Sequence, residues 1–285
     1  MRVTFVNRVI ARIRQRLGIP APWDEILVLG RNYMVRSDAF RRDGVDYDRA
    51  WFLACALHSH VIYDVGANTG ENAPIAFSNN ELKELVMVDA NPAALAAAAE
   101  MLVHNHLSDR ARFVCAFAGD VENSTIRFWT IGTGAAGSMY RSHARSAEAA
   151  GAAIEVPTVT LDALSHAFGS RPDFVKIDVE GAEFAVLEGS RRCAGEKETR
   201  FLVEMHSNPD LPMRENATRV LRWCEELGYN AWYLARESHL TDPDEIAHRG
   251  RCHLLLQPAD WSYPTWLRGI PQSAPLQSAL DAAAA

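Results

Sequence analysis

An acid and two glycines follow an apolar run in residues 61–77, VIYDVGANTGENAPIAF, with the spacing Asp64-x-Gly66-x-Asn68-x-Gly70. The apolar run is typical of a buried strand, and the residues after it predict a tight turn that begins a helix. Glycine lets the backbone approach a ligand closely, and asparagine tolerates a left-handed conformation. The spacing therefore predicts a ligand-binding turn at the end of a strand.

Two common nucleotide-binding motifs do not fit this turn, because it contains neither G-x-G-x-x-G nor the G-K-[ST] of a P-loop. Asp64 places a negative charge beside the turn, which suits a ligand with a positive group better than a pyrophosphate. Asp89 ends the next apolar run, ELVMVD, 25 residues after Asp64. An acid at that place hydrogen-bonds ribose hydroxyls in nucleoside-binding α/β folds, although it could also simply precede a helix that starts at Asn91 and Pro92. We favour the ribose role.

Composition and charge exclude several function classes. The 285-residue chain has a formal net charge of −7 at pH 7, and a nucleic-acid binder would need a basic face. Five cysteines without a C-x-x-C pair indicate reduced thiols, not a disulfide framework or a zinc site. The sequence shows no signal-peptide core, and no stretch approaches the roughly 18 apolar residues of a membrane span. We therefore predict a cytoplasmic protein that does not bind nucleic acid.

Three regions of the chain differ in pattern. Residues 1–58 begin with an arginine-rich stretch and are predicted to form an N-terminal helical extension. Residues 59–262 alternate short β-branched runs with helical patterns, which is typical of a parallel sheet covered by helices. The last two strand-like runs, 231–236 and 252–257, have no helical pattern between them and should pair antiparallel. Residues 263–285 offer little to bury and are predicted to be disordered.

Several segments together resemble the FkbM family of S-adenosylmethionine-dependent methyltransferases. The segments are DVGANTG at 64–70, VDANP at 88–92, GD at 119–120, VPTVTLDAL at 156–164 and PDFVKIDVEGAEFAVLEGS at 172–190. VDANP departs from the family's more frequent Glu–Pro pair, although Asp89 keeps the carboxylate. The resemblance covers about residues 60–208 and implies a class I methyltransferase fold. This fold is an α/β, Rossmann-like, mostly parallel sheet of seven strands with an antiparallel last strand.

The resemblance also implies S-adenosylmethionine as the methyl donor and S-adenosylhomocysteine as the product. Asp64 and the turn backbone would hold the methionine part of the donor, and Asp89 would hold the ribose. Phe117 and Asp120 would lie near the adenine, and Asp178 near the amino group or the acceptor. The residues expected to bind the cofactor are thus Asp64, Gly66, Ala67, Asn68, Gly70, Asp89, Ala90, Phe117, Asp120 and Asp178.

Methyl transfer to a hydroxyl needs a base that takes the proton. The candidates are His206, Asp178 and Glu180, with Glu204 close by. The ordinary pKa of histidine, about 6.5, suits a base at neutral pH, although His206 could equally shape its loop through hydrogen bonds. Asp178, Glu204 and His206 could also gather around a divalent metal ion, but no tight ligand spacing supports one, so we do not expect a metal site.

The residues and the resemblance together predict an S-adenosylmethionine-dependent O-methyltransferase. Its acceptor would be a small molecule or glycan: a hydroxyl of a sugar, glycan, glycolipid or polyketide-type natural product. One alternative is an NAD-dependent oxidoreductase or epimerase, against which the missing fingerprint at the turn counts. Another is a non-catalytic methyltransferase-like binding protein, against which the retained acids and His206 count.

Two further segments could contact partners. The insertion at 121–157 carries Ser138, Tyr140, Arg141 and His143, which either face the acceptor or belong to a flexible solvated loop. Residues 1–17 have one apolar helical face and one arginine face, with no acid. Such a helix would pack on the domain or on a second subunit of a homo-oligomer, or it would lie peripherally on an anionic membrane.

Overall fold

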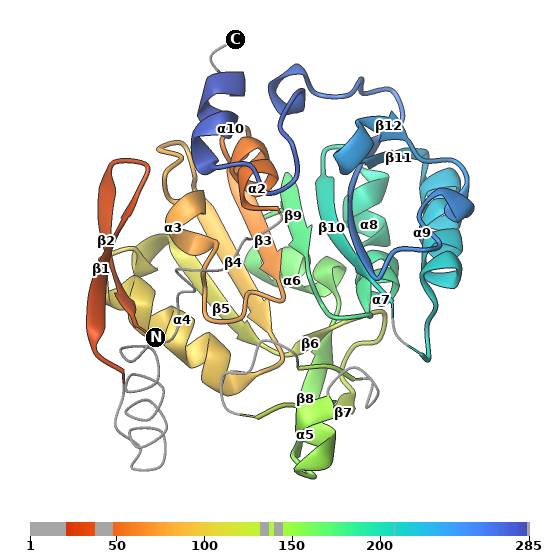
Figure 1. Ribbon diagram of the computed structural model, residues 1–285. Coiled ribbons are helices and arrows are strands. Elements are labelled where there is room, and N and C mark those ends of the chain that lie inside the picture. The colour runs from red at the N-terminus through yellow and green to blue at the C-terminus, as the bar shows by residue number, and fades with distance from the viewer. Residues whose placement is uncertain (1–20, 38–47, 132–136, 140–144, 208, 284–285) are drawn as a thin grey trace, which may run out of the picture.

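The computed structural model describes residues 21–37, 48–131, 137–139, 145–207 and 209–283. An eight-stranded sheet forms the centre of the protein (Figure 1). From one edge to the other it consists of β12 (Ser238–His239), β11 (Tyr229–Tyr233), β13 (Arg251–Pro258), β10 (Arg200–His206), β9 (Phe174–Ile177), β3 (Val61–Val65), β4 (Glu84–Asp89) and β5 (Ala111–Cys115).

The strand directions confirm the predicted class I methyltransferase sheet. Strands β10, β9, β3, β4 and β5 are all parallel to one another. Strand β13 is antiparallel to both β10 and β11, as expected for the last two long strands. The seven predicted strands are therefore all present, and the two-residue β12 adds an eighth at the edge.

Helices cover both faces of this sheet, because its strands are apolar on both sides. Along β4, Leu85 and Met87 belong to one core cluster, whereas Val86 and Val88 belong to the other. The first cluster includes residues of α2 (Arg49–Ala56), α3 (Ala73–Ala76) and α4 (Pro92–His104). The second includes residues of α6 (Leu161–Phe168), α7 (Glu183–Glu188), α8 (Arg191–Gly195) and α9 (Met213–Leu227). Among the described residues, no helix has the length and apolar character needed to cross a membrane.

The insertion after β5 forms a small sheet of its own beside the main one (Figure 1). Its strand order is β6 (Phe117–Ala118), β8 (Ala153–Val159) and β7 (Thr125–Trp129), and helix α5 (Arg145–Ala149) precedes β8. The sequence predicted β7 but not β8. Pro157 lies inside β8, and a proline within an alternating run counts against a strand. Tyr140, Arg141 and His143 lie outside the described residues.

The N-terminal region differs from the predicted helical extension. Residues 1–20, including the basic stretch 1–17, lie outside the described residues. The next segment forms a hairpin of β1 (Trp23–Val28) and β2 (Arg31–Arg36), and among the described residues of this region only α2 is helical as expected. Leu29 and Gly30 both adopt positive φ angles, 49° and 79°, which suit a two-residue hairpin turn. The apolar runs on either side of the turn, residues 26–29 and 33–35, are the signal that the sequence prediction missed.

The C-terminal segment is also more ordered than predicted. Residues 263–283 contain the short helix η4 (Thr265–Leu267) and helix α10 (Leu276–Ala283), which packs against α2. Leu267, Ile270 and Ala279 are buried, and the indole nitrogen of Trp51 donates a 2.8 Å hydrogen bond to the carbonyl of Ile270. The prediction of a disordered tail is therefore wrong for these residues. A few apolar side chains are enough to order this segment because they pack against α2 and become buried there.

Candidate active site

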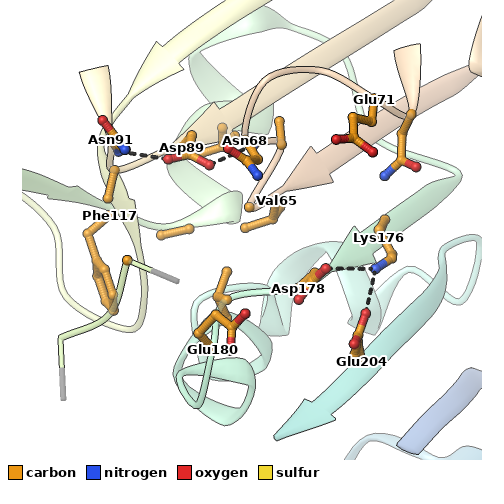
Figure 2. Close-up of a pocket in the computed structure, with 18 of the residues that line it drawn as sticks. Val65, Asn68, Glu71, Asp89, Asn91, Phe117, Lys176, Asp178, Glu180 and Glu204 are labelled. Atoms are coloured by element: carbon orange, nitrogen blue, oxygen red, sulfur yellow. Dashed lines mark hydrogen bonds and ion pairs between the residues drawn. The ribbon is translucent and has the colours of Figure 1, made fainter. Parts of the chain in front are cut away.

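A pocket of about 270 Å³ opens at the carboxyl ends of β3, β4, β9 and β10. Figure 2 shows two separate groups among its polar side chains. We call one group, together with two aromatic rings, the β4 end: Asn68, Asp89, Asn91, Phe117 and Phe128. The other group is the charged end: Lys176, Asp178, Glu180 and Glu204. Ligands bind at this edge of the sheet in α/β folds.

The predicted turn after β3 lines the pocket between the β4 end and the charged end. Gly66 has φ 84°, and a Cβ on it would lie 1.8 Å from the carbonyl oxygen of Asp178. Only glycine can therefore stand there. Gly66, Ala67 and Asn68 all line the pocket, and Asn68 adopts the expected left-handed conformation with φ 48°.

Gly70 has a different role from the one predicted. It is not among the residues that line the pocket, although its φ is 83°. A Cβ on Gly70 would lie 2.9 Å from the Cβ of Ala98 in α4. This glycine therefore lets the turn pack closely against a helix and does not face a ligand.

Asp89 lies where a ribose-binding acid is expected. Its two carboxylate oxygens accept hydrogen bonds of 2.7 Å from the backbone N–H groups of Asn68 and Asn91. Burial raises the pKa of Asp89, and these two hydrogen bonds oppose that change. Asn91 caps α4, since its side-chain oxygen accepts from the N–H groups of Ala93 and Ala94. Asp89, Ala90 and Asn91 all line the pocket, and Asn91 also caps the helix, so the acid and the cap are different residues.

Two predicted cofactor contacts, Asp64 and Asp120, are not among the pocket-lining residues. The side chain of Asp64 is buried, and its Oδ2 has no hydrogen-bond partner among the described residues. Burial raises the pKa of Asp64 to about 6, although Lys176 opposes the change. Asp120 is exposed. Phe117, predicted beside the adenine, does line the pocket, and the sequence reasoning missed Phe128 on β7.

Lys176 lies at the centre of the charged end. Its Nζ is 2.7 Å from Asp48 Oδ2, 3.4 Å from Asp178 Oδ2 and 3.6 Å from Glu204 Oε2. Burial disfavours the charge on Lys176, but the carboxylates of Asp178, Asp48 and Glu204 outweigh it and raise the pKa well above the usual value. The lysine is therefore a buried ammonium ion held by acids from different elements.

Two of the acids that line the pocket at this end, Asp178 and Glu180, follow β9. Burial raises the pKa of Asp178 to about 8, although the charge of Lys176 opposes the change. Glu180 has a positive φ of 52°, which is uncommon for a residue other than glycine. Its carbonyl oxygen accepts a 3.1 Å hydrogen bond from Ser138 Oγ, so the insertion contacts the loop that presents both acids.

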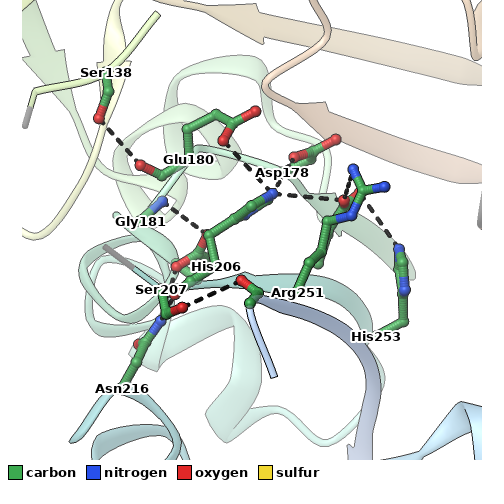
Figure 3. A network of polar contacts seen from close by, with 12 residues as sticks. Ser138, Asp178, Glu180, Gly181, His206, Ser207, Asn216, Arg251 and His253 are labelled. Carbon is green, nitrogen blue, oxygen red and sulfur yellow. Dashed lines mark hydrogen bonds and ion pairs between the residues drawn. The ribbon is translucent and has the colours of Figure 1, made fainter. Parts of the chain in front are cut away.

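The hydrogen bonds of His206 fit the second of the two roles considered for it, that of shaping its loop (Figure 3). Its Nδ1 lies 2.8 Å from Glu183 Oε1, and its Nε2 lies 3.5 Å from Glu204 Oε1 and 3.6 Å from Glu180 Oε2. Burial disfavours its charge, but the hydrogen bonds with Glu183 and Glu204 outweigh burial and raise its pKa well above 6.5. His206 is also not among the residues that line the pocket. A protonated, enclosed imidazole cannot accept a proton, so the prediction that it is the base lacks support.

Residues distant in sequence complete the charged end. Arg251 Nη1 lies 2.8 Å from Glu204 Oε1, and Arg49 of α2 pairs with Glu71 of the turn segment. The sequence gives no local signal for these pairs, since their members come from different elements. Two groups of donor atoms are close enough to hold a metal ion: Asp48, Glu204 and His253, and Asp178, Glu204 and His206.

Comparisons with solved structures give matches among methyltransferases, at low identity. The methyltransferase FkbM from Methylobacillus flagellatus is 16% identical with a TM-score of 0.43, and the match covers 70% of this chain but 43% of that one. TYW2 from M. jannaschii, in complex with AdoMet, is 12% identical with a TM-score of 0.44 and coverages of 83% and 84%. A SAM-dependent methyltransferase from Agrobacterium tumefaciens is 14% identical with a TM-score of 0.46 and coverages of 84% and 71%. At these TM-scores the matches carry no argument about function.

The family comparison is more informative. A search of curated proteins finds no significant match. The Methyltransferase FkbM domain matches residues 64–231, which span the sheet from β3 to β11 and include the turn, Asp89 and the charged end. This match covers more than half of the chain, which therefore belongs to the FkbM methyltransferase domain family.

Proposed function

We propose that this methyltransferase is an O-methyltransferase that acts on a hydroxyl of a sugar, glycan, glycolipid or polyketide-type natural product. The observation that carries the proposal is the position of Asp178, a carboxyl group with a raised pKa, at the pocket surface beside Glu180. A carboxylate with a raised pKa is a stronger base than an ordinary one, and a hydroxyl acceptor needs such a base. The NAD-dependent alternative does not fit the family to which the chain belongs.

The pocket fits S-adenosylmethionine, which supplies a methyl group activated by a positively charged sulfur. At the β4 end, Asp89 is positioned for ribose hydroxyls, and Phe117 and Phe128 offer apolar surface for a base. At the charged end, the acids around Lys176 favour a cationic ligand group. The glycine at position 66 keeps the backbone between the two ends free of a side chain.

The charged end also favours a neutral acceptor over an anionic one. Glu180 and Glu204 line the pocket there, and their negative charges would repel a carboxylate acceptor. A hydroxyl brings no charge of its own, and Asp178 would take its proton as the new C–O bond forms. His206 would act indirectly, because its positive charge lies 3.9 Å from Asp178 and 3.6 Å from Glu180 and holds these acids in place. Most of the rate would come from orientation of the two reactants.

The test uses donor with a labelled methyl group and pools of sugars, glycans, glycolipids and polyketides. We expect label in a product that survives mild alkali, because an O-methyl ether is stable there and a methyl ester is not. Label found only in an ester or on nitrogen would overturn the proposal. Calorimetry with S-adenosylhomocysteine and with NAD provides the control for the cofactor, and only the former should bind.

Membrane contact and self-association through residues 1–17 are a separate proposal, supported only by the basic amphipathic pattern of a segment outside the described residues. Co-sedimentation with anionic liposomes at low and high salt tests the membrane role. We expect salt-sensitive binding that deletion of residues 1–17 removes. Full-length protein that stays in the supernatant at low salt would leave only packing on the domain or on a second subunit.

A further inference from the structure

Lys176 occupies an uncommon position for a lysine, in the middle of a parallel sheet. It lies on β9, with Asp64 of β3 and Leu202 of β10 as its direct neighbours across the sheet. Its side chain is 2% exposed, and a lysine buried without acids would give up its proton. The carboxylates of Asp48, Asp178 and Glu204 lie within 3.6 Å of Nζ and keep it charged.

The groups around this ammonium are those that bind a hard divalent cation. The donor atoms of Asp48, Glu204 and His253 lie within 4.8 Å of one another, and so do those of Asp178, Glu204 and His206. Glu204 belongs to both groups, and Lys176 Nζ contacts carboxylates of both (Figure 2). An ammonium group has three N–H donors, and three carboxylates surround this one. The lysine thus forms ion pairs with the three acids that would otherwise be metal ligands.

We propose that the ammonium group of Lys176 is a resident cation that takes the place of a divalent metal ion at the charged end. One positive charge holds Asp48, Asp178 and Glu204 together and still leaves their combined charge negative, so the pocket keeps its preference for a cationic donor. A divalent ion at the same place would cancel more of that charge. The statement that methyl transfer needs no metal ion rests on the proposed function. The position of the Lys176 ammonium among the three acids does not depend on that function.

The test removes the ammonium and offers a metal ion instead. Lys176→Ala leaves a space lined by carboxylates and imidazole nitrogen, a mixture of hard donors that suits Mn²⁺. At ~1 mM Mn²⁺ we expect the Tm of this variant to rise by roughly 5–10 °C, as for a ligand at about 100 times its Kd. Calorimetry should show one Mn²⁺ ion bound per chain. The wild-type protein should show neither the shift nor the binding.

Two controls distinguish the effect of the space that Lys176 leaves from the effect of losing its charge. Lys176→Met removes the charge but fills the same space, so it should not bind Mn²⁺. Lys176→Ala combined with Asp48→Asn should lose the gained Mn²⁺ binding, because Asp48 makes the shortest contact with the ammonium.

Each result of these measurements either supports or overturns the proposal. Stoichiometric Mn²⁺ binding by wild-type protein, or none by a folded Lys176→Ala variant, would overturn the proposal. If Lys176→Ala folds only when Mn²⁺ is present, the proposal is supported, and if it stays unfolded with Mn²⁺ the proposal fails. These measurements need no acceptor. A separate assay, in which EDTA leaves wild-type methyl transfer unchanged, depends on the proposed function and would fail independently of the binding results.

Discussion

The β4 end and the charged end of the pocket differ in how the chain builds them. At the β4 end, Asp89 accepts hydrogen bonds from the backbone of Asn91, two residues away, and of Asn68. Asn68 lies in the turn after β3, the strand that pairs with β4. At the charged end, Lys176 gathers acids from β9, from β10 and from Asp48, which precedes α2. The first end depends on backbone geometry over a short stretch, and the second depends on charges brought from distant elements.

This difference predicts different consequences of mutation. A change at the β4 end removes one contact with the donor and should leave the chemistry of the bound complex intact. A change at the charged end alters the pKa of every neighbour, because buried charges interact strongly in a low-dielectric environment. Five experiments test this contrast, in order of the effect we expect.

Gly66→Ala should have the largest effect, since this residue touches both ends. The new methyl group would lie 1.8 Å from the carbonyl oxygen of Asp178, so the turn or β9 must move. We expect donor affinity to fall on the order of 100-fold or more, measured by calorimetry with S-adenosylhomocysteine. Gly30→Ala is the matched control, because Gly30 has a similar φ of 79° but open space around it. Equal donor affinities of the two variants would show that the turn is not part of the donor-binding site.

Asp178→Asn should lower kcat by about 10²- to 10⁴-fold, the usual contribution of a general base. Donor affinity should fall as well, because the amide cannot supply the negative charge that favours a cationic donor, so kcat is measured at saturating donor. Asp120→Asn is the control, since Asp120 is an exposed acid that does not line the pocket. An unchanged kcat in Asp178→Asn would leave Glu180 as the base or show that the transfer needs none.

Asp89→Asn should change donor affinity and not kcat. Donor affinity should fall about 10- to 100-fold, which corresponds to the loss of a hydrogen bond to a charged group. At saturating donor, kcat should stay close to that of the wild type, because Asp89 lies at the β4 end. Steady-state kinetics with donor varied over a wide range separates the two effects. A fall in kcat larger than the fall in affinity would contradict the division of the pocket into two ends.

Donor affinity should depend on pH through the charged end. The pKa of Asp178 is raised to about 8, so the free protein holds a proton there at neutral pH. A cationic donor favours the carboxylate, and binding must therefore release that proton. Affinity should rise with pH from about 6 to 8, by at most ~tenfold per pH unit, and then level off. Calorimetry in two buffers of different ionisation enthalpy measures the released proton, and a flat profile would contradict the raised pKa.

The raised pKa of Asp178 also makes the stability of the fold depend on pH, in the direction opposite to that of donor affinity. Between about pH 4 and 8 the folded protein holds a proton on Asp178 that the unfolded chain has lost. The contribution of Asp178 to the free energy of unfolding therefore decreases as pH rises through this range. Asp178→Asn removes both effects, so its donor affinity should be less dependent on pH than that of the wild type.

Ser138→Ala should have the smallest effect. It removes the 3.1 Å hydrogen bond to the carbonyl of Glu180, whose backbone has a positive φ. We expect kcat to fall about 3- to 10-fold, which corresponds to one ordinary hydrogen bond, with donor affinity unchanged. Ser124→Ala serves as the control, because Ser124 lies in the same insertion and is exposed. A loss of donor affinity in Ser138→Ala would show that the insertion supports the β4 end instead.

The mostly parallel sheet with an antiparallel last strand, the turn at Gly66 and the acid at Asp89 could all be predicted from the sequence alone. These features were predictable because each depends on residues that are close together along the chain. A strand that ends in a glycine turn, and an acid that ends the next strand, must meet at one edge of a parallel sheet. The antiparallel pairing of β11 and β13 followed from the missing helix between them.

Which of the predicted residues face the pocket, and in which state, depends on contacts that form only when distant parts of the chain come together. Gly70 packs against α4, Asp64 is buried away from the pocket, and His206 is a cation enclosed by acids. No local pattern contains this information, because a pKa depends on burial and on charges that other elements bring close. The order of the C-terminal segment has the same origin, since α2 provides the surface that buries Ile270 and α10.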